Sequence, residues 1–185
     1  RATTENAAIV YTNFAVNAQL ARRGNDMASK RTALIMELTP SRRSLLAELL
    51  QELGFTLVVE ALSPDNALER MNMIAFDAVF FEVATGDENA FAFVRNLRLD
   101  RTRDFRGPIV VVSADSQRGA IERARDAGAN GFLARPFSVA TLKLQIARAI
   151  NDERPYIASA AFAGPDRRRF GTAARSRERT ERRPD

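Results

Sequence analysis

The clearest indication of the fold comes from residues 109–137, IVVVSADSQRGAIERARDAGANGFLARPF. Residues 109–113 are a short apolar run of the kind that a parallel sheet buries on both faces. Residues 117–127 are predicted to form a helix, which Gly128 ends. Residues 131–134 are a second short apolar run. A strand, a helix and a strand in this order predict two parallel strands joined by a helical crossover.

The same alternation of strands and helices continues on both sides of this stretch. Ser41, after Pro40, is a candidate helix N-cap, and Ser63 is a second one with Pro64 at the first helical position. Apolar strands that alternate with helices indicate a parallel sheet covered by helices on both faces. The further predicted strands are residues 33–38, 56–61 and 78–83, and the further predicted helices are residues 41–53, 63–71, 91–97 and 138–150.

The composition allows one ordinary globular domain and excludes several kinds of site. The chain has 185 residues, 45% of them hydrophobic, with no cysteine and no histidine. Disulfides, thiolate or imidazole metal ligands and a Ser-His-Asp triad are therefore excluded, so catalysis would have to use carboxylates, hydroxyls, lysine or arginine. No apolar run is long enough for a transmembrane helix and no signal peptide is visible, so we expect a cytoplasmic protein.

The net charge of +5 lies in the ends of the chain. Residues 31–150 contain 15 basic and 15 acidic side chains, whereas residues 1–30 carry a charge of +2 and residues 151–185 a charge of +3. We therefore expect a domain of residues 31–150, an N-terminal extension of residues 1–30, helical or disordered, and a flexible Arg-rich tail of residues 151–185. The extension could dock on the domain, mediate a dimer, or be a leader before a native start near Met27.

Side chains at the ends of the predicted strands are the candidate functional residues. In a parallel sheet of this kind, the ligand or reaction site lies at the carboxyl ends of the strands. These ends meet along one edge of the sheet, so residues far apart in the sequence are expected to lie close together. The residues at these positions are Glu37, Leu38, Glu82, Ser113, Ala114 and Arg135.

Several short motifs, in a fixed order and spacing, carry a family resemblance. They are Pro40-x-x-Arg43-x-Leu45-Leu46 after the first strand, Phe76-Asp77-Ala78-Val79 at the third, Val112-Ser113-Ala114 at the fourth, and Gly128-Ala129-Asn130-Gly131-Phe132-Leu133-Ala134-Arg135-Pro136-Phe137 at the fifth. With these motifs, residues 31–150 resemble the CheY-like receiver domains of bacterial two-component response regulators. The resemblance implies a flavodoxin-like α/β fold with five parallel strands in the order 2-1-3-4-5, and a role in signal transduction in the bacterial cytoplasm.

The chemistry that the resemblance implies is phosphorylation of an aspartate at the end of the third strand. In the family, two acidic residues after the first strand help to hold Mg²⁺, a serine or threonine ends the fourth strand, and a lysine precedes the proline after the fifth. The corresponding residues here are Glu37 and Leu38 for the acidic pair, Glu82 for the phosphoacceptor, Ser113 for the hydroxyl and Arg135 for the lysine. Three of these five positions are changed outright, and Glu37 keeps only the charge.

These changes predict an atypical receiver that lacks the phosphoacceptor aspartate and is not an enzyme. Leu38 removes a carboxylate from a site where Mg²⁺ needs octahedral oxygen ligation. Glu82 places its carboxylate one methylene further out, and a misplacement of ~1 Å can cost ~10²-fold in rate. Arg135 suits a bidentate pair with Glu82 or Glu37, so we expect a permanent Glu82–Arg135 ion pair and no bound metal. The alternatives are unused polar residues at solvated strand ends, or residual Mg²⁺-dependent phosphorylation of Glu82.

Ser113 and Phe132 are the candidate residues for a conformational switch. They lie where the family couples a hydroxyl shift to an aromatic rotamer. Simple packing in the core would also explain both residues.

One face of the predicted domain is a candidate partner surface. The face formed by the fourth helix, the fifth strand and the fifth helix commonly binds partners in receivers. We expect a signalling protein to bind it, such as a kinase or a flagellar or other output protein, although an ordinary solvated helix surface is the alternative. Its basic residues would be Arg118, Arg123, Arg125, Lys143 and Arg148.

The arginines outside the strand ends raise the possibility of a nucleotide ligand. Some receiver-like proteins with Arg-rich tails bind cyclic di-GMP, and this tail resembles them in composition. Arg101 and Asp104 fit the RxxD pattern used for that ligand, although about one or two such matches are expected by chance here. Arg167, Arg168 and Arg169 could neutralise phosphates and stack on bases. A solubilising tail, a protein partner and a nucleic acid are alternatives; DNA is disfavoured because no DNA-binding output domain is recognisable, and no membrane partner is expected.

Overall fold

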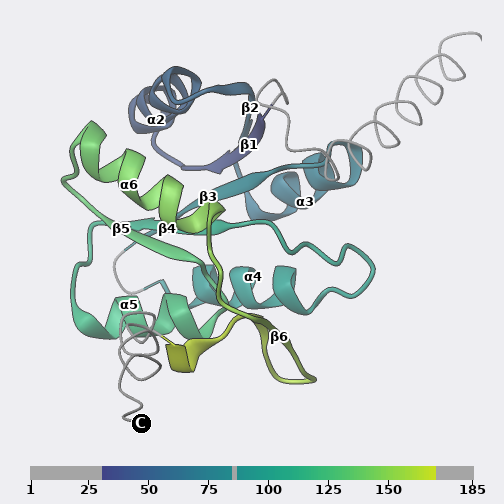
Figure 1. Ribbon diagram of the computed structural model, residues 1–185. Coiled ribbons are helices and arrows are strands. Elements are labelled where there is room, and N and C mark those ends of the chain that lie inside the picture. The colour runs from purple at the N-terminus through teal and green to yellow at the C-terminus, as the bar shows by residue number, and fades with distance from the viewer. Residues whose placement is uncertain (1–30, 85–86, 170–185) are drawn as a thin grey trace, which may run out of the picture.

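The computed structural model describes residues 31–84 and 87–169, in which strands and helices alternate along the chain (Figure 1). The strands of the main sheet are β1 (Arg31–Met36), β2 (Phe55–Ala61), β3 (Ala78–Val83), β4 (Ile109–Ser113) and β5 (Gly131–Ala134). The helices are α2 (Pro40–Glu52), α3 (Pro64–Met73), α4 (Glu88–Leu99), α5 (Arg118–Asp126) and α6 (Val139–Ile150). None of the helices in the described residues has the length and apolar character that crossing a membrane requires.

The five strands form one parallel sheet in the order β2-β1-β3-β4-β5, which confirms the predicted order. The chain moves from β1 outward to β2 and then returns past β1 to β3, so the direction of winding reverses between β1 and β3. A crevice at the carboxyl ends of two such strands is the usual ligand position in open α/β sheets. Met36 lies opposite Phe81 in the register, so Glu37 and Glu82 follow at neighbouring positions.

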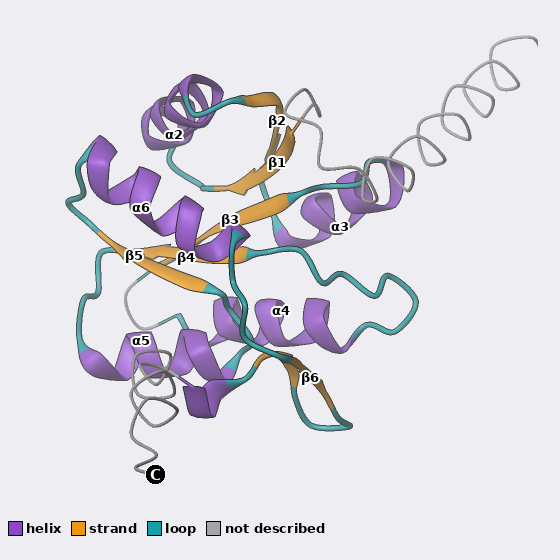
Figure 2. Ribbon diagram, viewed as in Figure 1, coloured by secondary structure: helices purple, strands orange, loops and turns teal. Residues whose placement is uncertain are grey.

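Helices cover both faces of the sheet (Figure 2). On one face, Leu50 of α2 and Leu142 of α6 pack in a cluster with Phe80 of the central strand. On the other face, α3, α4 and α5 share a second cluster, in which the rings of Phe81 and Phe93 stack at 4.9 Å. The inner strands β1, β3 and β4 are apolar along most of their length because both faces are buried, whereas the edge strand β2 has several exposed residues. Each large side chain buried in this way contributes about 1.5–3 kcal/mol.

The start of α2 differs from the prediction. Thr39, not Ser41, is the N-cap residue, and it makes no side-chain capping bond. Pro40 is the first helical residue because its fixed φ suits the first turn and its missing N–H costs nothing there. The proline also holds Thr39 in an extended conformation (φ −82°, ψ 116°). Ser63 is the N-cap of α3, as predicted, and its hydroxyl accepts a hydrogen bond from the Asn66 amide.

The prediction of a flexible tail from residue 151 onward is wrong for residues 151–169. This segment forms a hairpin of β6 (Tyr156–Ala158) and β7 (Ala163–Pro165), followed by the 3-10 turn η1 (Arg167–Arg169). Phe162 and Ala163 are buried, so the hairpin has enough apolar surface to pack on the domain. The sequence signal for it is an eleven-residue uncharged run, PYIASAAFAGP. The rest of the predicted tail and the N-terminal extension lie outside the described residues.

Candidate functional site

Two carboxylates come together where β1 and β3 end. Glu37 follows β1 directly and is 1% exposed, and Glu82, near the end of β3, is 12% exposed in its side chain. Two acidic groups placed this close would repel each other in a buried site. The arrangement therefore needs positive charge from other elements.

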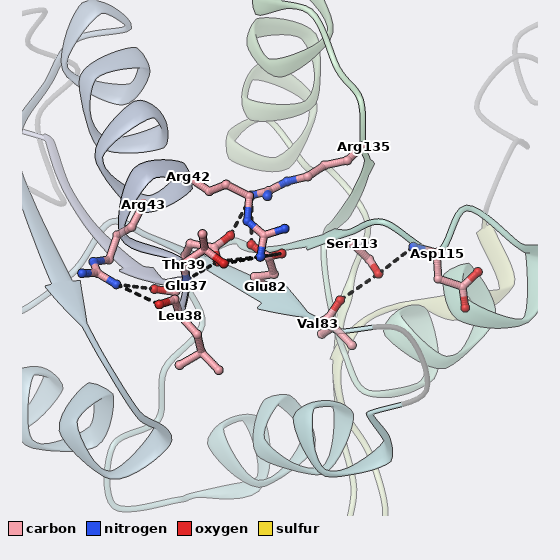
Figure 3. A network of polar contacts seen from close by, with 10 residues as sticks. All are labelled: Glu37, Leu38, Thr39, Arg42, Arg43, Glu82, Val83, Ser113, Asp115 and Arg135. Atoms are coloured by element: carbon pink, nitrogen blue, oxygen red, sulfur yellow. Dashed lines mark hydrogen bonds and ion pairs between the residues drawn. The ribbon is translucent and has the colours of Figure 1, made fainter.

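Two arginines supply that charge, and the four side chains form a closed cluster (Figure 3). Nη2 of Arg135, which follows β5, lies 2.9 Å from Oε2 of Glu37 and 2.9 Å from Oε2 of Glu82. Nη2 of Arg42, in the first turn of α2, lies 3.4 Å from Oε1 of each glutamate. Each carboxylate thus faces both guanidinium groups, and the four charges cancel. We call Glu37, Glu82, Arg42 and Arg135 the charge cluster.

Backbone contacts fix the charge cluster in place. The Thr39 amide donates to Oε1 of Glu37 at 2.7 Å, and the backbone amide of Arg135 donates to the Ser113 carbonyl at 2.8 Å. Arg43 donates to the Glu37 carbonyl at 2.7 Å and to the Glu60 carboxylate at 2.7 Å, which holds the loop between β1 and α2. These bonds orient the charged groups before any partner arrives.

The pairing of Arg135 differs in detail from the predicted bidentate fork. One nitrogen, Nη2, bridges the two glutamates, and Nη1 is buried without a hydrogen-bond partner among the described residues. The second cation was not predicted, because which helical side chain reaches the strand ends depends on where α2 begins. Arg42 occupies the first helical turn, where the helix dipole disfavours a cation. An arginine in this unfavourable position is the sequence feature that indicates acidic neighbours around Arg42.

The residues present do not fit the Mg²⁺ that receiver chemistry uses. Leu38, at the second acidic position, is 70% exposed and its side chain points away from the charge cluster (Figure 3). Glu37 and Glu82 are the two carboxylates at the site, and guanidinium groups occupy both. No group of three metal-ligating side chains occurs in residues 31–84 and 87–169. Octahedral Mg²⁺ would need oxygen ligands that this set does not offer.

The Ser113 hydroxyl faces away from the carboxylates. Its Oγ donates to the Val83 carbonyl at 2.8 Å and accepts from the Asp115 amide at 3.1 Å (Figure 3). Ser113 is 1% exposed, so the bond to Val83 is shielded from water, and the bond from Asp115 is partly buried. Phe132 is half-buried and packs against the core cluster shared by α3, α4 and α5. Both residues have a packing role here, and the predicted coupling between them stays a prediction.

Replacing Ser113 with alanine is expected to lower the free energy of unfolding by about 1–2 kcal/mol, because the buried Val83 carbonyl and the partly buried Asp115 amide lose the hydroxyl as a partner. Urea denaturation measures the change. Ser116→Ala is the matched control, since Ser116 is exposed and should have no resolvable effect. Equal losses in the two variants would contradict this role of the hydroxyl.

The other candidate residues lie apart from the charge cluster. Arg101 is exposed, and Asp104 pairs with Arg106 at 2.9 Å, so the RxxD residues do not pair with each other. Arg167 pairs with Asp126 at 3.5 Å; the Arg168 side chain is exposed, and that of Arg169 lies outside the described side chains. On the predicted partner face, Lys143 and Arg148 are exposed, Arg118 pairs with Glu122, Arg123 with Asp115 and Arg125 with Asp126.

Comparisons with known proteins all lead to one family. The family model of the response regulator receiver domain matches residues 33–147. The chain is 37% identical over 117 residues to the transcriptional regulatory protein PdtaR of Mycobacterium tuberculosis, a match that covers 63% of this chain and 55% of PdtaR. It is 30% identical over 110 residues to the chemotaxis protein CheY-3 of Vibrio cholerae, which covers 60% of this chain and 84% of CheY-3. The chain thus spans about half the length of PdtaR.

Solved structures share the same sheet and helices. The chemotaxis protein CheY4 of Vibrio cholerae superposes with a TM-score of 0.58 at 24% identity, covering 65% of this chain and 99% of that chain. A CheY-like receiver domain from Methylobacillus flagellatus superposes with a TM-score of 0.54 at 28% identity, covering 66% of this chain and 100% of that chain. The similarity to CheY4 bears on the fold alone.

Proposed function

The chain belongs to the response regulator receiver family, and from this premise we propose that it is a phosphorylation-independent receiver that acts by binding a protein partner. The proposal treats the domain as a non-enzymatic interaction module of two-component signalling in the bacterial cytoplasm. One observation carries it: the charge cluster fills the site with the protein's own ion pairs. The whole protein's activity and pathway are part of the proposal, since PdtaR is matched over only 55% of its length.

The charge cluster opposes phosphoryl transfer for two physical reasons. The Glu82 carboxylate would have to leave Arg135 and Arg42 before it could attack a phosphoryl donor. Breaking a buried pair exposes an uncompensated charge to a low-dielectric environment and costs several kcal/mol. In addition, the two carboxylates among the described residues of the site are both paired with arginines, and no third acidic side chain joins them there, so a metal that would neutralise an incoming phosphate is disfavoured. We therefore expect the charge cluster to keep the same arrangement whether or not a phosphoryl donor is present.

The proposed partner surface is the face of α5, β5 and α6. Its α6 part combines the exposed cations Lys143 and Arg148 with Leu144, which is 48% exposed. Exposed apolar groups among polar ones are typical of protein interaction surfaces. The relatives are named for transcriptional regulation and chemotaxis, which are different outputs, so we propose a signalling protein as the partner without specifying the pathway.

The test is phosphorylation by acetyl phosphate with Mg²⁺, followed by intact-mass measurement with a fast quench, because acyl phosphates are labile. We expect no phosphoryl adduct on the wild-type protein. The variant L38D/E82D/R135K rebuilds the family's acidic pair, aspartate and lysine, and is expected to accept a phosphoryl group under the same conditions. Circular dichroism establishes that both proteins are folded.

An adduct on the wild-type protein that disappears in Glu82→Gln would contradict the proposal and support Glu82 as a phosphoacceptor. If neither the wild-type protein nor the rebuilt variant forms an adduct, Leu38, Glu82 and Arg135 are not what blocks transfer, and the cause proposed here is wrong.

The cyclic di-GMP reading stays a prediction. In the described residues, Asp104 and Arg167 are already paired, with Arg106 and Asp126 respectively. These contacts do not favour a nucleotide site over a solvated surface.

A further inference from the structure

A buried arginine lies at the edge of the sheet opposite the charge cluster. Arg98, near the end of α4, is 4% exposed. It donates to the carbonyls of Phe105, Gly107 and Gly128 at 2.9, 2.8 and 3.0 Å, and to Oδ1 of Asn130 at 2.6 Å. Burial lowers the pKa of Arg98 to about 10, so the group remains charged at neutral pH. A charge buried here joins α4 to the loop before β4 and to the turn between α5 and β5.

Asn130 carries this connection onward to the segment after α6. Its Nδ2 donates to the Asp152 carboxylate at 2.9 Å, and its carbonyl accepts from Arg154 at 3.0 Å. Burial raises the pKa of Asp152, but hydrogen bonds from Arg154 and Asn130 outweigh it and hold the pKa below its usual value. Asp152 is therefore ionised at neutral pH and is linked to Arg98 through one side-chain amide.

Two glycines bring the hairpin into backbone contact with the domain. Gly128, at φ +98°, has so little room that an added Cβ would lie 2.4 Å from the Ala163 carbonyl oxygen. Gly164, at φ +151°, would place a Cβ 2.7 Å from the Cα of Gly128. Both positions need glycine for the backbone conformation and for the close approach. The two main chains touch each other directly here, so a larger residue at either glycine could not be accommodated by moving side chains.

Apolar and cationic side chains add to the contact between residues 152–169 and the rest of the domain. Phe162 is 7% exposed, and the Arg167 guanidinium lies 4.2 Å from the centre of its ring while pairing with Asp126 at the end of α5. The ring of Tyr156 lies under the guanidinium groups of Arg98 and Arg106, at 5.9 and 5.3 Å from its centre. The hairpin thus contacts α4 and the turn that leads into β5, and η1 contacts the end of α5 (Figure 1).

We infer that residues 152–169 form a clamp that holds the end of α4, the end of α5 and the start of β5 in one fixed arrangement. This inference rests on the proposed function, because it assumes that α5 and β5 belong to the face that binds the partner. Arg135 anchors β5 at the carboxyl edge of the sheet, and the clamp anchors α5 and β5 at the amino edge. With both edges fixed by buried polar contacts, the face cannot shift without breaking several of them. The partner therefore meets a rigid surface.

Hydrogen exchange followed by mass spectrometry tests the clamp on the full chain. In Phe162→Ala, amide exchange in α5 and in the turn at residues 127–130 is expected to rise about tenfold or more, because local opening no longer has to break the junction. Ile157→Ala is the matched control: Ile157 is a hairpin residue that is 40% exposed, and its loss should leave exchange in α5 unchanged.

Arg167→Met is the milder second variant, in case Phe162→Ala does not fold. It removes the tie to Asp126 and is expected to raise exchange in the last turn of α5. The clamp is contradicted if exchange in α5 stays at the wild-type rate in whichever of these variants folds. This outcome is separate from the phosphorylation test, because a wild-type protein that accepts a phosphoryl group would overturn the proposed function and leave the exchange result unaffected.

Discussion

Replacing Arg135 with methionine should lower the free energy of unfolding by about 3 kcal/mol, because a buried ion pair loses one partner. Glu37, with a side chain that is 1% exposed, would keep only Arg42 at 3.4 Å and the Thr39 amide. Glu82 would keep only the more distant Arg42. Methionine retains most of the side-chain length, so the loss reports the charge and its hydrogen bonds. Urea denaturation monitored by circular dichroism measures it.

Two controls separate the charge cluster from general effects of removing an arginine. Arg118→Met removes an exposed arginine that pairs with Glu122, and no resolvable change is expected. Adding Glu82→Gln to Arg135→Met should restore part of the lost stability, since one of the two uncompensated carboxylates becomes neutral. A loss in Arg135→Met no larger than in Arg118→Met would mean that the charge cluster is not a stable element of the fold.

Replacing Arg98 with methionine is expected to cost about 3–5 kcal/mol, since four acceptors, two of them buried and two partly buried, lose the arginine at once. These are the carbonyls of Phe105, Gly107 and Gly128 and Oδ1 of Asn130. Thermal and urea unfolding of the full chain measure the effect. We further expect the hairpin to loosen in this variant, because only the Ile109 amide would then hold the Asn130 side chain in the orientation that reaches Asp152.

Arg101→Met is the control for this second prediction, since Arg101 is an exposed arginine in the loop that follows α4. Arg98→Lys should recover only part of the stability, because an ammonium group is a compact donor that cannot reach all four acceptors, which are spread over two segments. Full recovery with lysine would show that only the charge matters and that the fork geometry of the guanidinium does not.

The fold was predictable because local and long-range signals in this sequence agree. Apolar runs, helix caps and the two proline positions marked all five strands and all five helices of residues 31–150. The errors were of boundary: β1 ends at Met36 and not at Leu38, α4 begins at Glu88 and not at Phe91, and Thr39 rather than Ser41 caps α2. The strand order came from the family resemblance, since nothing in the apolar pattern distinguishes inner from edge strands of a parallel sheet.

The site was predictable in part. Glu37, Glu82 and Arg135 could be placed together because the carboxyl ends of parallel strands meet at one edge. Arg42 could not, because its reach depends on the position and direction of α2. The hairpin and Arg98 were also missed, since an Arg-rich composition outweighed the uncharged run at residues 155–165, and a charged residue in a helix is ordinarily expected to face solvent.

An amide NMR spectrum recorded with and without Mg²⁺ and beryllofluoride, a mimic of the phosphoryl group, tests whether the charge cluster still responds to a phosphoryl group. We predict that the signals near Glu37, Glu82 and Arg135 do not move in the wild-type protein, whereas those of L38D/E82D/R135K do. Concerted shifts at these three residues together with Ser113 and Phe132 in the wild-type protein would contradict the account, because they would mean that the site still binds a phosphoryl group and still switches.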